Sequence, residues 1–343
     1  MAETNTVAAS AAAPTLEVRD LQTHFFTRAG VVKAVDGVSF TVGRGKVLGL
    51  VGESGSGKTV TGFSILGLVD APGRIVGGEI LFHGQNLAKL SEEEMRRLRG
   101  NRIAMIFQDP MMTLNPVLRV DTQMIETVLA HTKVSKEEAR QRARDTLGMV
   151  GIPSPDERLK SYPHQFSGGM RQRVAIAIAL LHQPELIVAD EPTTALDVTI
   201  QAQILAEVQK LCEKTGTAMI WVTHDLSVVA GLADDIAVMY AGRVVERGPV
   251  SEVLDQPLHP YTHGLIGSVP SRNKRGEKLR QIPGMTPSLL SLPPGCAFRT
   301  RCPRAEADCA RDPALSELLP GRLARCFHPH QVAQGAAAEG AHA

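Results

Sequence analysis

The stretch that decides the fold is Gly52-Glu53-Ser54-Gly55-Ser56-Gly57-Lys58-Thr59. It follows the short apolar run 47–51 and precedes the mainly apolar segment 60–68. This order predicts a buried strand, a glycine-rich turn and a helix. Glycines let the turn fold closely around an anion, and the N–H groups that open a helix point toward that anion. The stretch therefore predicts a phosphate-binding loop of the pattern G-x-x-x-x-G-K-[ST].

Two side chains at the end of this loop predict its ligand. Lys58 can reach the terminal phosphates of a nucleoside triphosphate as a point charge. The Thr59 hydroxyl offers a hard oxygen to the Mg²⁺ that accompanies such a nucleotide. An eight-residue pattern can also be a chance glycine-rich turn, so the rest of the chain decides between the two interpretations.

Composition excludes several classes of protein. The 343 residues carry 37 basic and 36 acidic side chains, a net charge of +1, so no basic field holds a nucleic-acid backbone. Aromatic residues make up 4%, which argues against stacking on bases. The longest apolar run, Val174 to Leu181, has eight residues, whereas a membrane helix needs ~20. The amino terminus lacks signal-peptide features. These observations predict a soluble cytoplasmic protein without a nucleic-acid partner.

Hydrophobic patterning predicts alternating strands and helices. Strands are expected at 16–26, 38–42, 77–82 and 101–107. Capping boxes open two helices, one at Ser91 with Glu94 and one at Ser135 with Glu138. The middle of the chain, about 109–172, has no strand signal, and we expect it to be a helical insertion. The small-residue lead-in 1–13 and the tail 331–343 are expected to be disordered.

A second anion-binding helix terminus is indicated by Ser167-Gly168-Gly169, which opens a helix that ends near Leu181. The alternative is an ordinary serine N-cap followed by flexible glycines. The sequence of this segment alone does not choose between the two.

Two adjacent carboxylates, Asp190 and Glu191, follow the apolar run 186–189. Such a run is typical of a central parallel strand, and its carboxyl end faces the crevice where α/β sheets bind ligands. Asp190 can hold Mg²⁺ through water, and Glu191 can polarise or deprotonate an attacking water. A solvated acidic turn is the alternative.

Single side chains near the other strand ends are weaker candidates. His224 follows the strand expected at 217–222 and can hydrogen-bond the terminal phosphate or the water, although a lone histidine is more often structural. The aromatic rings of Phe25 and Phe26 precede the phosphate loop. Either ring can stack on an adenine, or both can be core residues of a strand.

With these pieces in place, residues 14–250 resemble the ATP-binding subunits of ABC transporters. The matching motifs, in chain order, are the phosphate loop 52–59, Gln108 as the Q-loop glutamine, Phe166 to Met170 as the signature, Leu186 to Glu191 as the Walker B strand, Ala195-Leu196-Asp197 as the D-loop and His224 as the switch histidine. The signature departs from the usual LSGGQ at its first and last positions. The resemblance implies an α/β fold of the P-loop NTPase (RecA-like) class, with an antiparallel β subdomain and the helical insertion.

The resemblance also implies the roles of the site residues. The phosphate loop would hold ATP, with Phe25 on the adenine. Mg²⁺ would be held by Thr59, Gln108 and Asp190. The catalytic set would be Glu191, His224 and Gln108. In this family the signature and D-loop, here Ser167, Gly168, Gly169 and Asp197, close over ATP bound to a second subunit, so hydrolysis implies a dimer with two ATP.

Residues 251–330 resemble the C-terminal extension of dipeptide and oligopeptide importer ATPases. The segments that carry the resemblance are His259 to Thr262, Ile282 to Gly284, Pro293 to Phe298 and Arg301 to Pro303. Other motifs are closest to the D-type subunit. The implied partners are a paralogous F-type ATPase, two transmembrane permeases and an extracytoplasmic peptide-binding protein, at the cytoplasmic face of the inner membrane. Alternatives are an importer for nickel, glutathione or a similar solute, an exporter ATPase, and a non-transport ABC protein.

Four of the five cysteines lie in this extension, at Cys296, Cys302, Cys309 and Cys326. The spacing C-x5-C-x6-C-x16-C argues mildly against a zinc finger, whose cysteines pair two to four residues apart. Four thiolates can equally hold an iron–sulfur cluster, and unligated buried cysteines are the third possibility. The resemblance implies a [4Fe–4S] cluster on these cysteines, around which the proline-rich extension would fold.

Overall fold

The computed structural model describes residues 13–193, 198–269 and 281–331. The phosphate loop follows β3, one of the two middle strands of a sheet of eight strands in the order β11-β12-β10-β9-β3-β8-β7-β6. The central strands are β3 (Val47–Val51), β6 (Ile103–Ile106), β7 (Leu186–Asp190), β8 (Ala218–Thr223) and β9 (Asp235–Tyr240). These five strands are parallel. Every residue of β3, β6, β7 and β8 is buried, as expected for a parallel sheet covered on both faces.

Successive residues of the central strands enter two different cores, because side chains of a strand alternate between its faces. In β3, Val47 and Val51 belong to one core, and Leu48 and Leu50 belong to the other. The first core also contains side chains from helices later in the chain. The second contains side chains from α1 (Lys58–Leu66) and from a smaller antiparallel sheet. The smaller sheet has the order β2-β1-β4-β5. Its strands are β1 (Leu16–Thr27), β2 (Gly30–Val42), β4 (Gly73–Phe82) and β5 (Gln85–Asn86).

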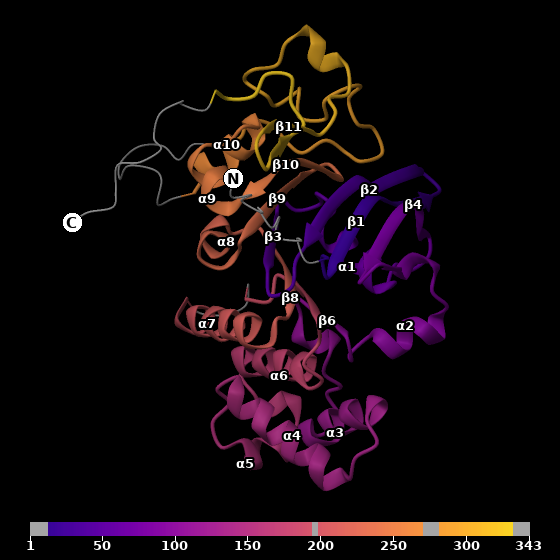
Figure 1. The fold of residues 1–343 in the computed structure, drawn as a ribbon, viewed down its shortest axis with the longest axis vertical. Coiled ribbons are helices and arrows are strands. Elements are labelled where there is room, and N and C mark those ends of the chain that lie inside the picture. Colours follow the sequence, from indigo (N-terminus) through magenta and orange to yellow (C-terminus); the bar gives the residue numbers. More distant parts are fainter. Residues whose placement is uncertain (1–12, 194–197, 270–280, 332–343) are drawn as a thin grey trace, which may run out of the picture.

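The predicted helical insertion is confirmed as helical in its described residues. It contains three complete α-helices, two short 3-10 helices and the start of α6 (Gly168–Leu180), and no strand. The complete α-helices are α3 (Val120–His131), α4 (Lys136–Met149) and α5 (Pro155–Leu159). They lie at one end of the long axis of the molecule, and the C-terminal segment 281–331 lies at the other (Figure 1). The remaining helices are α2 (Glu92–Leu98), α6 (Gly168–Leu180), α7 (Val198–Thr215), α8 (Leu226–Leu232), α9 (Val250–Asp255) and α10 (Pro260–Gly267).

Helix starts follow the capping signals in the sequence. The Ser91 hydroxyl accepts from the N–H of Glu94, and the Glu94 carboxylate accepts from the N–H of Ser91, so this capping box is complete. At α4 the Ser135 hydroxyl accepts from the N–H of Glu138 at 3.1 Å. Strand ends were predicted less well, because β4 begins at Gly73 and not at Gly77.

The C-terminal segment completes the large sheet. After β10 (Arg243–Pro249) the chain leaves the sheet and returns with β11 (Ser316–Leu319) and β12 (Arg322–Ala324). Strand β12 pairs antiparallel with β10. Phe298 of the same segment is buried in the first core. The segment is therefore packed onto the nucleotide-binding fold through backbone pairing and a shared core.

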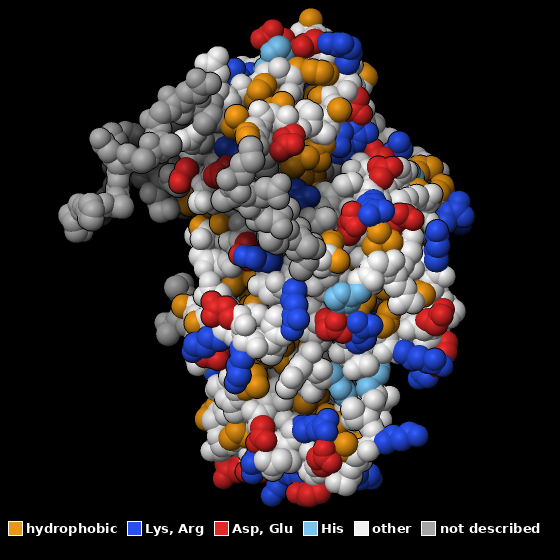
Figure 2. Space-filling model, viewed as in Figure 1, with side chains coloured by type: hydrophobic (Ala, Val, Ile, Leu, Met, Phe, Trp, Pro, Cys, Tyr) orange, Lys and Arg blue, Asp and Glu red, His pale blue; other side chains and the backbone are white. Residues whose placement is uncertain are grey.

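The surface carries charges of both signs. On the face seen in Figure 2, Lys and Arg side chains are interspersed with Asp and Glu side chains. This distribution agrees with the net charge of +1. Among the described helices, none combines the length and the hydropathy that a membrane span requires.

Candidate nucleotide-binding site

The phosphate loop connects β3 to α1, and its glycines are required by the surrounding backbone. Gly52 has φ 154° and Gly57 has φ 101°, in the region that favours glycine. A Cβ on Gly52 would lie 2.2 Å from the carbonyl oxygen of Met239, and one on Gly57 would lie 2.3 Å from that of Ala34. Strands β9 and β2 thus enclose the loop so closely that a side chain at either position would displace backbone.

The ammonium group of Lys58 lies inside the hollow of the loop. Its Nζ donates to the carbonyl oxygens of Gly52 at 2.8 Å and Glu53 at 3.0 Å. Burial lowers the pKa of Lys58, and the nearby carboxylates of Glu191 and Asp190 oppose this shift. Its third partner is the Ser56 hydroxyl at 3.4 Å, so a buried cation held by neutral groups is well placed to exchange them for phosphate oxygens.

Two oxygen donors lie side by side where α1 meets the end of β7. The Thr59 hydroxyl donates to Asp190 Oδ1 at 3.1 Å. Burial raises the pKa of Asp190, the hydroxyl of Thr59 opposes that shift, and the charge of Glu191 adds to it. A hydroxyl and a carboxylate are hard oxygen ligands, so these two residues fit Mg²⁺. A cation there would also remove the cost of the buried carboxylate charge.

The carboxylate of Glu191 lies between two polar side chains. Gln108 Nε2 donates to Glu191 Oε2 at 3.3 Å, and His224 Nδ1 lies 3.2 Å from Glu191 Oε1. The backbone of Glu191 has φ 44°, uncommon for a side chain of this size, and its N–H is bonded to the carbonyl of Val222. The three side chains follow β6, β7 and β8, so the parallel sheet brings them to one edge. A carboxylate oriented in this way can accept a proton from a water.

These residues line one open cleft of about 710 Å³, a size that suits a cofactor. Its lining includes loop residues 53–60 together with Gln108, Glu191 and His224. The predicted site residues from four separate motifs are thus brought together. Ala34 and Leu289 also line the cleft, and the sequence analysis named neither. Leu289 lies far along the chain from the loop and belongs to no motif, so only the fold reveals it.

Other predicted residues lie elsewhere. The ring of Phe25 covers Gly73 on the neighbouring strand and does not line the cleft. The segment Ser167-Gly168-Gly169 opens α6, where the Ser167 hydroxyl accepts from the N–H of Met170 at 3.3 Å, and it does not line this chain's own cleft either. Asp197 lies outside the described residues.

Comparisons with known proteins identify the family. A family model described as "ABC transporter" matches residues 35–194, and one described as "Oligopeptide/dipeptide transporter, C-terminal region" matches residues 245–309. The oligopeptide transport ATP-binding protein OppD of Escherichia coli is 50% identical over 92% of this chain and 93% of its own length. The chain belongs to the ABC transporter ATP-binding proteins.

Further relatives agree with this assignment. The dipeptide transport ATP-binding protein DppD of Bacillus subtilis is 52% identical over 86% of this chain and 89% of its own length. Among solved structures, the dimeric bacterial ABC transporter cassette MJ0796 superposes with a TM-score of 0.63 at 28% identity, covering 68% of this chain and 98% of that one. This ABC ATP-binding protein accordingly binds ATP with Mg²⁺ and hydrolyses it.

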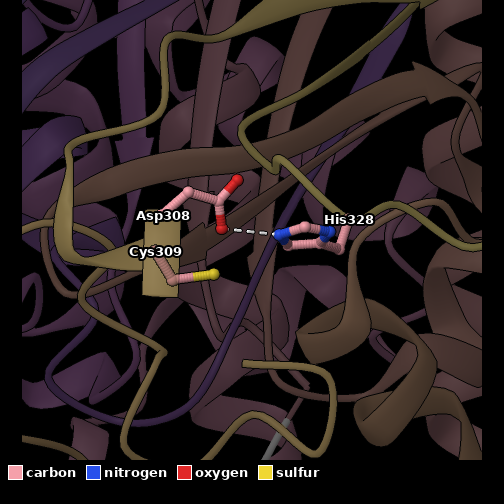
Figure 3. A group of neighbouring side chains, drawn as sticks. All are labelled: Asp308, Cys309 and His328. Carbon is pink, nitrogen blue, oxygen red and sulfur yellow. Dashed lines mark hydrogen bonds and ion pairs between the residues drawn. The ribbon is translucent and has the colours of Figure 1, made fainter. Parts of the chain in front are cut away.

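The structure and the comparisons correct the iron–sulfur prediction. The group of potential metal ligands that meets within the described residues is Asp308, Cys309 and His328, which contains one thiol and not four (Figure 3). Its two other members are already bonded to each other, since His328 Nε2 lies 2.7 Å from Asp308 Oδ1. The relatives and family models are named for ATP binding and transport.

The volume of the cavity between the cysteines is consistent with this correction. All four cysteines of the extension line one cavity, and its volume is about 10 Å³. That volume accommodates a single water-sized sphere, which is far smaller than a four-iron cluster. The cluster had been expected from the family resemblance, because the cysteine spacing by itself also allowed zinc or unligated thiols.

Proposed function

We propose that this ABC ATP-binding protein powers the import of dipeptides or oligopeptides across the cytoplasmic membrane. The observation that carries the proposal is the similarity to peptide transport proteins at about half of all positions along more than nine tenths of the chain. The C-terminal match to the oligopeptide/dipeptide transporter region supports it independently of the ATPase motifs.

The cleft suggests how ATP is held and cleaved. In the proposed arrangement the loop amides and Lys58 bind the phosphates, and Thr59 and Asp190 hold Mg²⁺ with Gln108 nearby. Mg²⁺ supplies charge neutralisation to the transferred phosphoryl group. Glu191 accepts the proton of the attacking water, and His224 orients that carboxylate from the neighbouring strand. The separation of 3.2 Å between these two side chains supports this assignment.

The active form is proposed to be a dimer with a paralogous F-type ATPase. The signature Ser167-Gly168-Gly169 would seal ATP held by the partner's phosphate loop, together with Asp197. This is consistent with the absence of the signature from the lining of the described cleft. The dimer would act beneath two permeases fed by an extracytoplasmic peptide-binding protein, at the cytoplasmic face of the inner membrane. The helical insertion of about 109–172 would contact the permeases.

The proposed division of the chain follows from these roles. Residues 14–250 form the nucleotide-binding domain, and residues 251–330 form the importer-type extension. Phe25 would contact the adenine once nucleotide is bound and the antiparallel sheet adjusts, since its strand β1 belongs to the sheet that packs against α1.

The test is a reconstituted transporter. The full chain would be co-expressed with a paralogous ATPase and two permeases, purified, reconstituted into liposomes, and assayed with a peptide-binding protein. We expect di- or oligopeptides to stimulate ATP hydrolysis and to accumulate inside the vesicles. The Glu191→Gln protein is the control for ATP-dependent uptake. Stimulation by nickel or glutathione, with none by peptides, would reassign the substrate and leave the ATPase assignment intact.

A further inference from the structure

The C-terminal segment forms hydrogen bonds to Glu53, the second residue of the phosphate loop. Arg301 donates from Nη1 to Glu53 Oε2 at 2.7 Å and from Nη2 to Glu53 Oε1 at 3.0 Å. The Thr286 hydroxyl donates to Glu53 Oε2 at 2.8 Å. Arg301 is 7% exposed. A bidentate, largely buried guanidinium–carboxylate pair has a defined geometry, unlike a surface ion pair.

Both members of the pair are fixed by further contacts. Arg301 Nε donates to the carbonyl of Pro283 at 2.9 Å, and the guanidinium lies 5.8 Å from the centroid of the Tyr240 ring. On the loop side, the N–H of Glu53 donates to the buried hydroxyl of Tyr261 at 2.9 Å. Glu53 is therefore held by its carboxylate and by its backbone, in each case by residues that lie between β10 and β11 in the chain.

The same residue forms part of the inner wall of the cleft. The carbonyl of Glu53 accepts from Lys58 Nζ at 3.0 Å and from the N–H of Ser56 at 3.2 Å. The carboxylate faces the C-terminal segment while the backbone faces the phosphate site. A rotation of Glu53 would consequently move a carbonyl and an amide that shape the anion-binding hollow.

The contact between Arg301 and Glu53 also has an electrostatic effect on the phosphate site. Burial opposes ionisation of Glu53, but the hydrogen bonds from Arg301 and Thr286 outweigh it and hold the pKa of Glu53 below its ordinary value. The carboxylate is thus ionised beside a site that receives a triphosphate. Without Arg301 it would repel that anion, because two like charges in a partly buried site are weakly screened.

We propose that Arg301 is a positioning residue for the ATP site, which neutralises Glu53 and holds the phosphate loop in the form that accepts MgATP. The C-terminal segment thereby sets the nucleotide affinity of a loop to which it is distant in sequence. The Thr286 hydroxyl helps to hold the same carboxylate in place through a hydrogen bond to one of its oxygens. The inference rests on the proposed assignment of the cleft as the ATP site.

The experiment uses the full chain and MgATP. Binding is measured by isothermal titration calorimetry for Arg301→Met, Glu53→Gln, the double variant and Thr286→Val. We expect Arg301→Met to raise the Kd for MgATP about tenfold, within the range usual for coupling between two sites. Thr286→Val should raise it less. The double variant should recover most of the affinity, since the unpaired carboxylate is gone, whereas a purely structural defect would persist.

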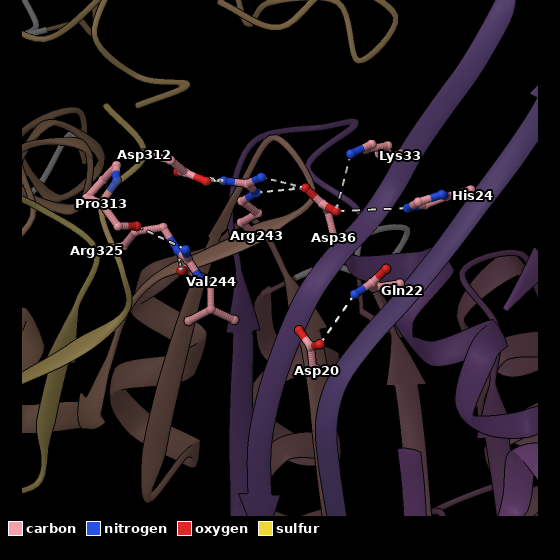
Figure 4. A network of polar contacts seen from close by, with 10 residues as sticks. All are labelled: Asp20, Gln22, His24, Lys33, Asp36, Arg243, Val244, Asp312, Pro313 and Arg325. Atoms are coloured by element: carbon pink, nitrogen blue, oxygen red, sulfur yellow. Dashed lines mark hydrogen bonds and ion pairs between the residues drawn. The ribbon is translucent and has the colours of Figure 1, made fainter. Parts of the chain in front are cut away.

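Asp312→Asn is the matched control. Arg243 donates from Nη1 to both carboxylate oxygens of Asp312, at 2.7 Å and 2.6 Å, and from Nη2 to Asp36 at 2.6 Å (Figure 4). These contacts connect the same C-terminal segment to β2 and do not involve the phosphate loop. This variant should keep the wild-type Kd. In the reconstituted ATPase, Arg301→Met should raise KM and leave kcat within about twofold, the pattern of a lost binding contribution.

The role of Arg301 and the assignment of the cleft are tested by different variants. A wild-type Kd in both Arg301→Met and Thr286→Val would overturn the positioning role. If Arg301→Met does not fold, Thr286→Val and Glu53→Gln decide, and a double variant no better than Arg301→Met also counts against the proposal. Lys58→Ala tests the underlying assignment separately, because normal MgATP affinity in that variant would mean that the cleft is not the ATP site.

Discussion

Replacing Arg322 should show how much the C-terminal segment contributes to the stability of the fold. Glu246 of β10 is 0% exposed and Arg322 of β12 is 2% exposed. Arg322 Nη2 donates to Glu246 Oε1 at 2.9 Å. The carboxylate also accepts from the N–H groups of Leu258 and His259, at 2.7 Å and 2.8 Å. The Arg322→Met substitution would leave a buried carboxylate with neutral donors only.

The magnitude follows from the burial of both partners. Breaking a buried ion pair by removing one partner costs about 3–5 kcal/mol, because the remaining charge is uncompensated. Burial already raises the pKa of Glu246 even with its hydrogen bonds in place. For a protein of this size that loss corresponds to a fall in Tm of about 10 °C. The assay is thermal unfolding of the full chain, followed by intrinsic fluorescence and calorimetry.

Two further variants make the result specific. Arg19→Met removes an arginine whose pair with Glu17 is exposed, so its Tm should match the wild type. Adding Glu246→Gln to Arg322→Met should restore part of the lost Tm, because the unpaired charge is removed. A Tm for Arg322→Met within about 1 °C of the wild type would refute the reasoning, since surface substitutions produce changes of that size.

The other predictions concern the ATP site and pH. Lys58→Ala should raise the Kd for MgATP by at least about tenfold, since hydrogen bonds to a charged group are worth about 1.5–3 kcal/mol; equilibrium binding measures this. Glu191→Gln should bind MgATP with unchanged affinity, lose hydrolysis and accumulate a closed dimer with the partner ATPase, which size-exclusion chromatography detects; normal turnover would remove Glu191 from the general-base role. Burial lowers the pKa of His259 from 6.5 to about 3, so the unfolded chain binds more protons below pH 6.5. Stability should therefore fall as the pH drops through this window, by about 2 kcal/mol at pH 5, and His259→Gln should flatten that slope in urea titrations.

The grouping of the candidate site residues in one cleft was predictable because its signals are local. The loop 52–59 and the carboxylates Asp190 and Glu191 each stand directly after a buried apolar run, and parallel strands bring such positions to one edge. Gln108 and His224 follow two further strands of the same sheet. Motif order and strand periodicity therefore sufficed to predict the α/β fold and the residues that meet at its centre.

Contacts across long stretches of sequence were decided by the tertiary structure alone. No periodicity links Arg301 to Glu53, and none brings Leu289 to the cleft, because such pairs are set by how the elements pack and not by their spacing. The cysteines show the same limit, since their spacing left several ligands possible and only the fold shows that the four thiols surround one small cavity. The sequence by itself determined the nucleotide-binding core through local patterns of burial and turn chemistry. The tertiary structure decided which distant residues contact that core. The reason is that a contact between residues far apart in sequence forms only where packing brings the two segments together.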